Sequence, residues 1–299
     1  MDRFHLMNVF AAVAEEESFA AGARRLGMSP PAVTRSISAL ERRLGVQLLT
    51  RTTRYVRATD AGLRYLESTR RILAEVDEAD EAAAGVHAAP RGQLAVTAPV
   101  LFGSMFVMPR VIDYLKQFPD VTISGLFLDR VVNLLEEGLD VGIRIGHLPD
   151  SSMRAIQVGQ VRRVVCATPE YLAQNQEPSQ PQELAQHTII AAMPVSPASE
   201  WHFVRAKQPI NVRVQPRLTV TNNDAAIQAV LSGFGITRLM SYQIAGHLAA
   251  GRLKRILAKF EAEPLPIHVL HREGRQASAK VRSFVDFLVE HLRTDLALI

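Results

Sequence analysis

The stretch that most constrains the fold of this chain runs from Ser29 to Gly45, with the sequence SPPAVTRSISALERRLG. Ser29 is a residue type that favours the N-cap of a helix, because its hydroxyl can accept a hydrogen bond from a free backbone N–H of the first turn. Pro30 suits the first helical position, where a missing N–H costs nothing. Gly45 suits the left-handed position that ends a helix. The sequence therefore predicts a helix between these two signals.

This predicted helix has one apolar face and one short, polar and basic face. The apolar residues recur at three- and four-residue steps, which is the helical period: Val33, Ile37, Leu40 and Leu44. The polar face carries no side chain too bulky for the backbone to approach a DNA major groove: Pro31, Thr34, Arg35 and Ser38. We therefore interpret the segment as a DNA recognition helix.

The segments around this helix complete a winged helix-turn-helix. Ser18 is the predicted cap of a short helix that ends at Gly27, which gives helix, tight turn and helix at the spacing of this motif. An earlier helix is expected to bury the face formed by Phe4, Met7, Phe10, Val13 and Ala14. Residues 48–59 alternate Arg and Thr with apolar residues, as a two-stranded wing would, and place three basic side chains near phosphates or a minor groove: Arg51, Arg54 and Arg57.

Charge is distributed unevenly along the chain. The formal net charge is +4 over 299 residues, but the segment from Ala20 to Arg57 holds eight arginines and a single acidic residue, Glu41. Residues 1–65 account for the whole excess of positive charge, and residues 66–299 are balanced. This pattern indicates an N-terminal domain that binds nucleic acid, joined to a neutral part with another role. The alternative is a basic face that is only solvated.

Length and composition suggest two or three domains in a reducing compartment. The chain is 47% hydrophobic and 21% charged, which is ample for ordinary cores. The single cysteine, Cys166, excludes an internal disulfide framework, and we expect an inert buried thiol there. The N-terminus lacks the features of a signal peptide, and no apolar run reaches the roughly 18 residues of a membrane helix. We expect a cytoplasmic protein that does not contact membranes.

Residues 59–84 predict a long helix. Thr59 is its expected cap, and Asp60 lies near the positive end of the helix dipole. A stripe at nearly heptad spacing runs along it: Leu66, Thr69, Leu73, Val76 and Ala83. A helix of this length, about 37 Å, cannot bury the stripe against a short wing, so we expect it to pair with a second copy. The alternative is packing on its own chain. Residues 85–92 are rich in Gly, Pro and small residues and predict a hinge.

From Gln93 the sequence alternates between apolar strands and amphipathic helices. This alternation is typical of parallel sheets covered on both faces. Strands are expected at 93–99, 121–128, 139–146, 161–168, 188–193, 217–221 and 266–274. Helices are expected at 101–119, 130–138, 169–174, 222–235 and 279–292. About 200 residues suffice for two such lobes with a crevice between them.

The chain resembles the LysR-type transcriptional regulators. AGARRLGMSPPAVTRSISALERRLG and LLTRTTRYVRATDAG carry the resemblance in the N-terminal part. It continues through DVGIRIG at 140–146, CATPEYL at 166–172 and NNDAAIQAVLSGFGITRL at 222–239. The resemblance implies a multidomain α+β and α/β fold: a winged helix-turn-helix at 1–59, a linker and dimerisation helix with hinge at 60–91, and an effector-binding domain at 92–299. That domain would have the two-lobed fold of type II periplasmic binding proteins, with lobe I at 92–161 and 265–299 and lobe II at 162–264.

One departure from this family affects DNA recognition. Many members carry Gln at the position of Pro30, which can pack on a sugar or a thymine methyl but forms no side-chain hydrogen bond. Base readout is then expected from Thr34, Arg35 and Ser38, with apolar contact from Pro31, and Arg35 is the best candidate for paired bonds to a guanine. Ser29 is the remaining residue of this segment that is expected to contact DNA. Phosphate contacts are expected from Arg51, Thr52 and Arg54, unless the wing arginines only solubilise a strand pair.

A ligand is expected in the crevice at the carboxyl ends of strands, where helix N-termini expose free N–H groups. The candidate residues lie at strand-to-helix joints: Thr97, Ala98, Pro99, Val100, Thr168, Thr221, Asn222 and Asn223. Arg144 could add a charged clamp for an organic or aromatic acid. The alternative is that Thr97 and Asn222 only cap helices while Arg144 pairs with Asp140 or Asp129. The resemblance, more than the spacing, favours the Thr and Asn positions as pocket-lining.

Other chemistry-bearing residues have simpler explanations. Trp201 is expected in the core, although an aromatic side chain stacked on a ligand is an alternative. His268 and His271 lack metal-ligand spacing with any other ligand type, so neither a metal nor a cofactor is expected. The three glutamates at 15–17 are interpreted as a solvated turn.

These observations favour a ligand-responsive regulator of transcription. The resemblance implies a homodimer on a pseudo-palindromic operator in double-stranded DNA, with half-sites roughly 34–36 Å apart, assembly into homotetramers and contact with RNA polymerase. A ligand-independent repressor of the same family is the near alternative. An enzyme or a solute-binding module is the distant one, since nucleophile elbow, phosphate loop, dinucleotide glycine pattern and export signal are all missing from the sequence. We therefore expect no catalysis.

Overall fold

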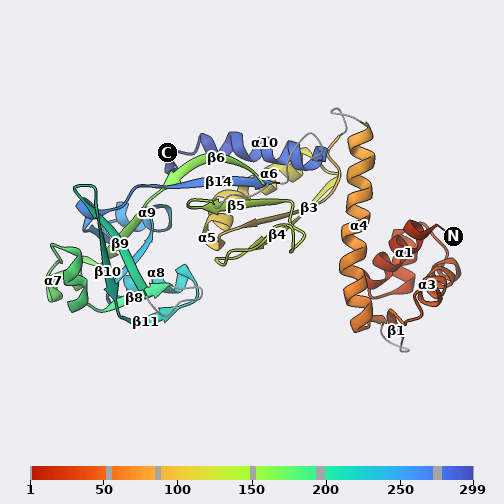
Figure 1. Ribbon diagram of the computed structural model, residues 1–299, viewed down its shortest axis with the longest axis horizontal. Coiled ribbons are helices and arrows are strands. Elements are labelled where there is room, and N and C mark those ends of the chain that lie inside the picture. The colour runs from red at the N-terminus through yellow and green to blue at the C-terminus, as the bar shows by residue number, and fades with distance from the viewer. Residues whose placement is uncertain are drawn as a thin grey trace. The chain divides into compact units, whose positions relative to one another are not determined.

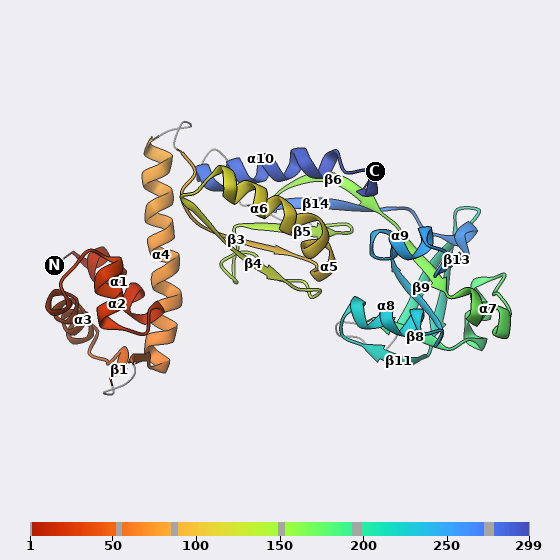
Figure 2. The same ribbon diagram turned by 180° about the vertical axis from the view of Figure 1, so that it is seen from behind.

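The structure is a computed structural model that describes residues 2–51, 56–84, 89–148, 153–192, 199–271 and 278–298 (Figures 1 and 2). It divides into two compact units, Met1–Ala88 and Ala89–Ile299. Across these ranges, no helix combines the length and apolar character needed to span a lipid bilayer.

The first unit is a helix-turn-helix followed by a strand pair and a long helix. Its elements are α1 (Arg3–Glu15), α2 (Phe19–Arg25), α3 (Pro30–Leu44), β1 (Leu49–Arg51), β2 (Val56–Ala58) and α4 (Asp60–Ala84). Strands β1 and β2 are antiparallel, with Thr50 opposite Arg57. The core gathers apolar side chains from α1, α2, α3, β1 and α4. The predicted order of helix, tight turn, helix and two-stranded wing is therefore what the chain forms.

Local capping signals set the helix boundaries in this unit. The Ser18 hydroxyl accepts from the backbone N–H of Ala21 at 3.2 Å, and the Thr59 hydroxyl accepts from Gly62 at 3.0 Å. Gly27 and Gly45 have φ angles of 62° and 69°, the left-handed conformation that ends a helix at low cost for glycine. These four predictions are confirmed because each depends on a few neighbouring residues.

The buried face of α1 differs in part from the predicted face. Met7, Phe10 and Val13 are buried, as predicted, but Phe4 is 44% exposed. The buried arc of the helix turns toward Leu6 and Val9, which leaves Phe4 beyond its edge. The prediction for Phe4 is therefore wrong.

The predicted dimerisation stripe on α4 packs in part on its own chain. Leu66 and Thr69 are buried, and Leu66 and Leu73 belong to the core shared with α1 and α3. The prediction considered only the short wing as a partner, whereas α1 supplies the surface that covers this part of the helix. Leu63, in the first turns of α4, is 56% exposed. The side chain of Ala83 lies outside the described residues.

The second unit contains two five-stranded sheets. The first has the order β4-β3-β5-β14-β6 and consists of β3 (Gly92–Ala98), β4 (Val121–Phe127), β5 (Val141–Ile145), β6 (Arg154–Val161) and β14 (Leu265–His271). The second has the order β11-β8-β12-β7-β13 and consists of β7 (Arg163–Ala167), β8 (Ile189–Ala192), β11 (Pro216–Val220), β12 (Ile236–Met240) and β13 (Lys254–Ile256). The chain leaves the first sheet after Val161 and returns to it at Leu265.

Both sheets are mixed, which corrects the expectation of parallel sheets. In the first sheet β3 is parallel to β4 and β5, but β14 runs antiparallel to β5 and β6. In the second sheet β8 is parallel to β11 and β12, whereas β7 and β13 are antiparallel neighbours. The antiparallel strands are those next to the two crossings between sheets. The first strand after a crossing, β7 or β14, enters its new sheet from the direction of the sheet that the chain has just left. The alternation of strands and helices therefore does not determine whether that strand is parallel or antiparallel to its neighbours.

Helices cover one face of the first sheet and both faces of the second. In the first, α5 (Val100–Phe102), the π-helical turn Gly103–Val107 and α6 (Met108–Gln117) form one continuous helix, which lies beside α10 (Ala279–Arg293) over the strands. In the second, α8 (Asn223–Leu231) and α9 (Ser241–Ala249) pack on alternate residues of β7, including Cys166. The other face of the second sheet packs on α7 (Pro169–Asn175) and on the antiparallel hairpin of β9 (Ser199–Arg205) and β10 (Gln208–Val214). The sequence reading missed this hairpin, β12, β13 and α9.

The predicted helix at residues 130–138 is not formed. The segment makes successive turns, with Glu137 donating to the carbonyl of Asn133 at 3.0 Å and Leu139 to that of Leu134 at 2.8 Å. The Asn133 side chain accepts from the N–H of Leu135, a local bond that competes with helix formation. Val132 is buried with Leu134 and Leu139 on the face of the first sheet away from α10. The segment thus packs on this face of the sheet as irregular turns and not as a helix.

Candidate DNA-binding and effector sites

The candidate DNA-binding face of α3 is directed to solvent. Ser29, Pro30, Pro31 and Arg35 are exposed, and Thr34 and Ser38 are half-buried. The opposite stripe of α3, which includes Val33, Ile37 and Leu40, is buried in the core of the first unit. Burial of that stripe fixes the rotation of the helix about its axis. The structure therefore brings the six candidate positions of this helix onto one accessible surface.

Ser29 occupies the N-cap position of α3, but its hydroxyl makes no capping bond. Pro30 and Pro31 have no N–H to offer, and the next donor, the N–H of Ala32, bonds to the carbonyl of Ser29 at 2.9 Å. The expected side-chain cap is therefore wrong. The Ser29 hydroxyl is left at the amino end of the helix, where the helix dipole favours a negatively charged group such as a phosphate.

Glu41 holds the wing against α3, a role that the sequence reading missed. Its carboxylate oxygen Oε1 accepts from the backbone N–H groups of Leu48 and Leu49, at 2.8 and 3.1 Å. These two residues lead into β1, so one side chain in the last turns of α3 sets the start of the wing. The signal in the sequence was that Glu41 is the single acidic residue in the basic segment from Ala20 to Arg57.

The wing candidates are described in part. Arg51 is the last residue of β1, whereas Thr52 and Arg54 lie outside the described residues. Their phosphate contacts stay predictions.

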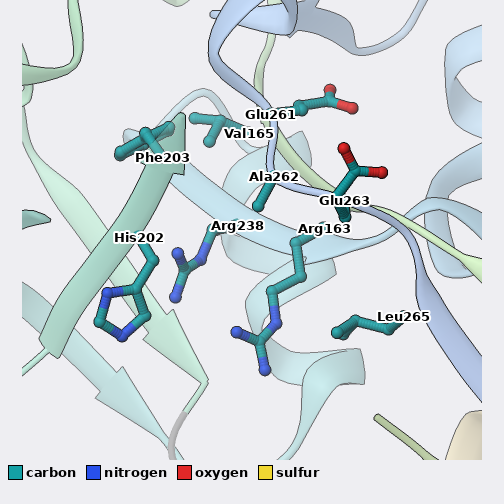
Figure 3. A pocket seen from close by; sticks show the side chains of 9 residues that line it. All are labelled: Arg163, Val165, His202, Phe203, Arg238, Glu261, Ala262, Glu263 and Leu265. Carbon is teal, nitrogen blue, oxygen red and sulfur yellow. The ribbon is translucent and has the colours of Figure 1, made fainter. Parts of the chain in front are cut away.

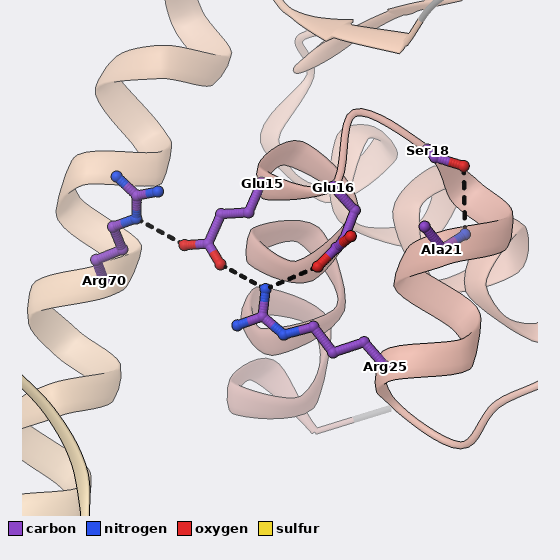
Figure 4. A network of polar contacts seen from close by, with 6 residues as sticks. All are labelled: Glu15, Glu16, Ser18, Ala21, Arg25 and Arg70. Atoms are coloured by element: carbon purple, nitrogen blue, oxygen red, sulfur yellow. Dashed lines mark hydrogen bonds and ion pairs between the residues drawn. The ribbon is translucent and has the colours of Figure 1, made fainter. Parts of the chain in front are cut away.

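An ion-pair network joins α1, α2 and α4 (Figure 4). The Glu15 carboxylate bonds Arg25 and Arg70, each at 2.8 Å, and Glu16 lies 3.5 Å from Arg25. The interpretation of these glutamates as a solvated turn is therefore wrong for Glu15, because residues 10 and 55 positions away approach it only in the folded chain. Burial raises the pKa of Glu15, but the bonds from Arg70 and Arg25 outweigh it and leave the pKa below its ordinary value.

Replacing Glu15 with Gln is expected to destabilise the first unit by about 0.5–1 kcal/mol at pH 7, the usual range for partly exposed ion pairs. Because the pKa of Glu15 is lower in the folded state, its stabilisation is present above the unfolded pKa and is lost as pH falls through the folded value. The difference from wild type should therefore begin to shrink below about pH 4, near the unfolded pKa, and vanish once the pH is below the folded pKa. Urea unfolding at several pH values tests this, with Glu17→Gln as control. An undiminished difference at pH 3 would contradict it.

The effector candidates of the first sheet lie at the carboxyl end of β3. Thr97 and Ala98 are buried, and the Thr97 hydroxyl has no hydrogen-bond partner in the part of the chain that the structure describes. Thr97 therefore does not cap a helix. Pro99 and Val100 begin the helix that continues into α6. The hydroxyl of Thr97 and the apolar side chains of Ala98, Pro99 and Val100 therefore lie together at one edge of the sheet.

Asp129 joins this edge to the second sheet. Its carboxylate accepts from the N–H of Val100 at 3.1 Å and from the side-chain amide of Asn223 at 3.2 Å. Val100 opens the helix after β3, and Asn223 opens α8 after β11. The candidate effector residues near Val100 and at Thr221–Asn223 are thus close together. The carboxylate of Asp129 lies between them. Asn222 caps α8 by accepting from Ala225 at 2.8 Å, as its simpler explanation required.

Thr168 does not lie at this edge. It caps α7 through a bond from the N–H of Tyr171 at 3.2 Å and is buried. Strand β7 is antiparallel to β12, with Arg163 opposite Met240. The carboxyl end of β7 therefore points away from the carboxyl ends of β8, β11 and β12, and Thr168 is separated from Asn223 by the length of the sheet. We leave it out of the candidate effector site.

Arg144 forms neither of the expected ion pairs in the described structure. Its guanidinium donates to the carbonyls of Ile143 at 3.0 Å and Val132 at 3.2 Å, which fastens the irregular segment to β5. Burial lowers the pKa of Arg144, and the charge of Glu137 opposes that effect. Asp140 instead accepts from the N–H of Ala95 at 2.7 Å. Arg144 is therefore held by backbone carbonyls beside the first sheet.

Comparisons with known proteins agree with this geometry. Residues 4–63 match the family described as bacterial regulatory helix-turn-helix protein, lysR family, and residues 87–293 match the LysR substrate binding domain. The chain belongs to the LysR family of transcriptional regulators. It therefore has a DNA-binding helix-turn-helix and an effector-binding domain.

Relatives of this LysR regulator match it over nearly their whole length. The HTH-type transcriptional regulator PtxR of Pseudomonas aeruginosa is 34% identical over 95% of this chain and 91% of its own. The regulator CrgA of Neisseria meningitidis is 31% identical over 97% of each chain. The CrgA structure superimposes with a TM-score of 0.62 at 30% identity, covering 96% of this chain and 98% of its own. The virulence activator AphB of Vibrio cholerae shares the fold, with a TM-score of 0.61 at 24% identity over 97% and 100%.

Two expectations about side chains outside these sites are resolved. Trp201 is 4% exposed and belongs to the core beneath the hairpin. Cys166 is buried, and burial raises the pKa of its thiol to about 12. A thiol with this pKa is almost entirely protonated at neutral pH, so it is a poor nucleophile.

Proposed function

We propose that this LysR regulator reads a pseudo-palindromic operator as a homodimer, with the exposed face of α3 in the major groove of each half-site. The observation that carries this proposal is the accessible set of Pro31, Thr34, Arg35 and Ser38 on a helix whose other side is fully packed. Two small hydroxyls beside one guanidinium suit base edges, and the basic segment around them suits phosphates. The protein acts by binding and not by catalysis, in the cytoplasm.

Selection from random DNA tests this reading. The full-length protein is mixed with a pool of random duplexes, and bound molecules are amplified and sequenced. We expect enrichment of inverted half-sites whose centres are about one helical turn apart. Binding of the selected duplex should weaken steeply with added salt, whereas its preference over scrambled duplex should persist. A pool that stays random after several rounds would refute sequence-specific recognition.

Self-association is the second element of the proposal. Leu63 on α4 is exposed within the first unit, and a row on the helix after β3 is exposed at three- and four-residue steps: Met105, Met108 and Ile112. Large apolar side chains in such a row favour burial against another surface. The exposed Leu63 on α4 and the separate apolar row of the second unit support a homotetramer built from dimers. Contact with RNA polymerase would then depend on how this assembly presents its DNA-bound units.

The effector is proposed to bind at the edge formed by Thr97, Val100 and Asn223. Helix N-termini and amides suit the carboxylate of a small organic acid. Asp129 already accepts from Val100 and Asn223, so an acid must displace that carboxylate from both donors. Entry of the effector would then break a bond between the two sheets, which couples binding to their relative position.

Asp129→Asn is expected to tighten binding of an acidic effector, because the variant keeps the size of the side chain and removes its like charge. An increase of about threefold to tenfold in affinity corresponds to roughly 1 kcal/mol. Calorimetric titration of acids found by thermal-shift screening measures this effect, with the exposed Asp113→Asn as a matched control. Equal or weaker binding of every acid by Asp129→Asn would place the effector elsewhere.

A further inference from the structure

A small cavity, separate from the edge at Asp129, lies in the effector-binding unit on the face of the second sheet away from α8. Its volume is about 50 Å³, and it is lined by β7, β12, the hairpin strand β9 and the segment before β14 (Figure 3). Arg163 is the first residue of β7 and Leu265 the first of β14. The cavity therefore touches both places where the chain crosses between the two sheets.

Two arginines from neighbouring strands point into this cavity. Val165 lies opposite Arg238 and Met240 lies opposite Arg163 in the antiparallel pair of β7 and β12. Because side chains alternate along strands, Arg163 and Arg238 extend from the same face. Figure 3 shows both guanidinium groups directed into one space, with His202 on one side and Leu265 on the other.

The positive charge of this pair is not balanced by neighbouring acids. Nη1 of Arg238 is buried and has no hydrogen-bond partner within the described ranges. Burial and the charge of Arg163 lower the pKa of Arg238 to about 9. Among the acids that line the cavity, Glu261 is bound through both oxygens to Arg255, and no ion pair joins Glu263 to either arginine in the described structure.

A buried guanidinium without an anionic partner is costly for a protein to keep. Packing accounts for part of Arg238, since its guanidinium carbon lies 4.9 Å from the centre of the Trp201 ring. An aromatic face does not satisfy an N–H donor directed into a cavity. The arrangement suits a ligand that brings the missing negative charge.

We propose that this cavity binds a small anion through Arg238 and Arg163, as a site separate from the effector edge at Asp129. The cavity volume is well below the roughly 150 Å³ that accommodates a benzene ring, so the buried part is one carboxylate or phosphate group. Val165, Phe203 and Leu265 line the cavity and can contact a short aliphatic tail. The ligand class is inorganic phosphate or a short-chain carboxylate.

The position of the cavity gives the anion a regulatory role. An anion held by Arg163 contacts the residue next to the first crossing, and the wall at Leu265 belongs to the second. Occupancy then favours the relative position of the two sheets that closes the cavity. The anion site is separate from the edge where Asp129 contacts Val100 and Asn223, but both sites act on the relative position of the two sheets.

Titration of the full-length protein tests the site. Sodium phosphate, sodium butyrate and sodium chloride are compared at equal ionic strength by thermal shift and calorimetry. We expect phosphate or butyrate, but not chloride, to raise the Tm and to bind wild type in a saturable manner. Arg238→Met should weaken this binding at least tenfold, and Arg163→Met, which alters a more exposed side chain, should weaken it several-fold. The choice between phosphate and butyrate identifies the headgroup.

Arg217→Met is the matched control, because Arg217 stacks on Phe234 away from the cavity. It should bind the anion as wild type does. The proposal fails if wild type responds equally to all three salts, or if Arg238→Met and Arg217→Met bind the anion alike. Both cavity variants should still shift the selected operator duplex when no anion is added. Loss of DNA binding by wild type would instead contradict the proposed function and leave the anion result to be judged separately.

Discussion

Gly62→Ala is expected to unfold the first unit at ordinary temperatures and to abolish DNA binding with it. A Cβ atom at Gly62 would lie 2.0 Å from the carbonyl oxygen of Leu48, a backbone atom. That carbonyl cannot move freely, because it accepts from Thr59 at 2.9 Å while the N–H of Leu48 is held by Glu41. We expect a loss of more than about 3 kcal/mol in the free energy of unfolding, the size associated with severe overpacking.

Scanning calorimetry measures this effect on the full-length protein. The transition of the first unit should move down by many degrees or disappear, while that of the second unit stays in place. Gly246→Ala is the control, because a Cβ there meets nothing within 4 Å and the residue lies inside α9. This control should be neutral or stabilising by about 0.5–1 kcal/mol. Wild-type stability of Gly62→Ala would show that Leu48 and the wing can shift to admit a methyl group.

Arg35→Ala is expected to lower affinity for the selected operator by about fivefold to 150-fold, because paired guanidinium bonds to a base are worth roughly 1–3 kcal/mol. Arg35 is exposed on the candidate face of α3, and its removal leaves no cavity in the core. The protein should therefore remain folded while specificity falls. Affinity for scrambled duplex should change little. The measured quantity is therefore the ratio of the affinity for the selected operator to that for scrambled duplex.

Gel shifts over a series of salt concentrations distinguish base reading from simple charge. Arg43→Ala is the matched control, since Arg43 is an exposed arginine of the same helix, in its last turn and off the candidate face. It should affect specific and scrambled duplexes equally, if at all, and lower the salt dependence by at most about one phosphate contact. Equal losses for both variants on both duplexes would show that α3 supplies charge and does not read bases.

The features that the sequence predicted well depend on interactions between residues close together in the chain. Ser18, Gly27 and Thr59 each act on residues three or four positions away, so local chemistry determines the helix boundaries. The buried stripe of α3 was equally readable, because periodicity alone decides which side faces the core. The fold of the second unit followed from the resemblance and from alternating strands and helices, although the sense of the crossing strands did not.

The features that were missed depend on partners far away in sequence. Glu15 gains Arg70 only after folding, and Arg144 is fixed by the carbonyl of Val132 in a segment expected to be a helix. Thr168 has the right local chemistry at the wrong end of the sheet, because β7 is antiparallel to its neighbour. Asp129 was considered only as a partner of Arg144, since nothing local indicates that its carboxylate reaches Val100 and Asn223.

The packing of α4 on α1 sets the minimum fragment that can be studied alone. Leu66 and Leu73 form part of the wall that encloses the core of the helix-turn-helix. A fragment cut after Ala58, at the end of the wing, would expose that core to water and lack the arginine that holds Glu15. A DNA-binding fragment that folds by itself must extend at least through Leu73, so the segment that reads as a connector belongs structurally to the DNA-binding domain.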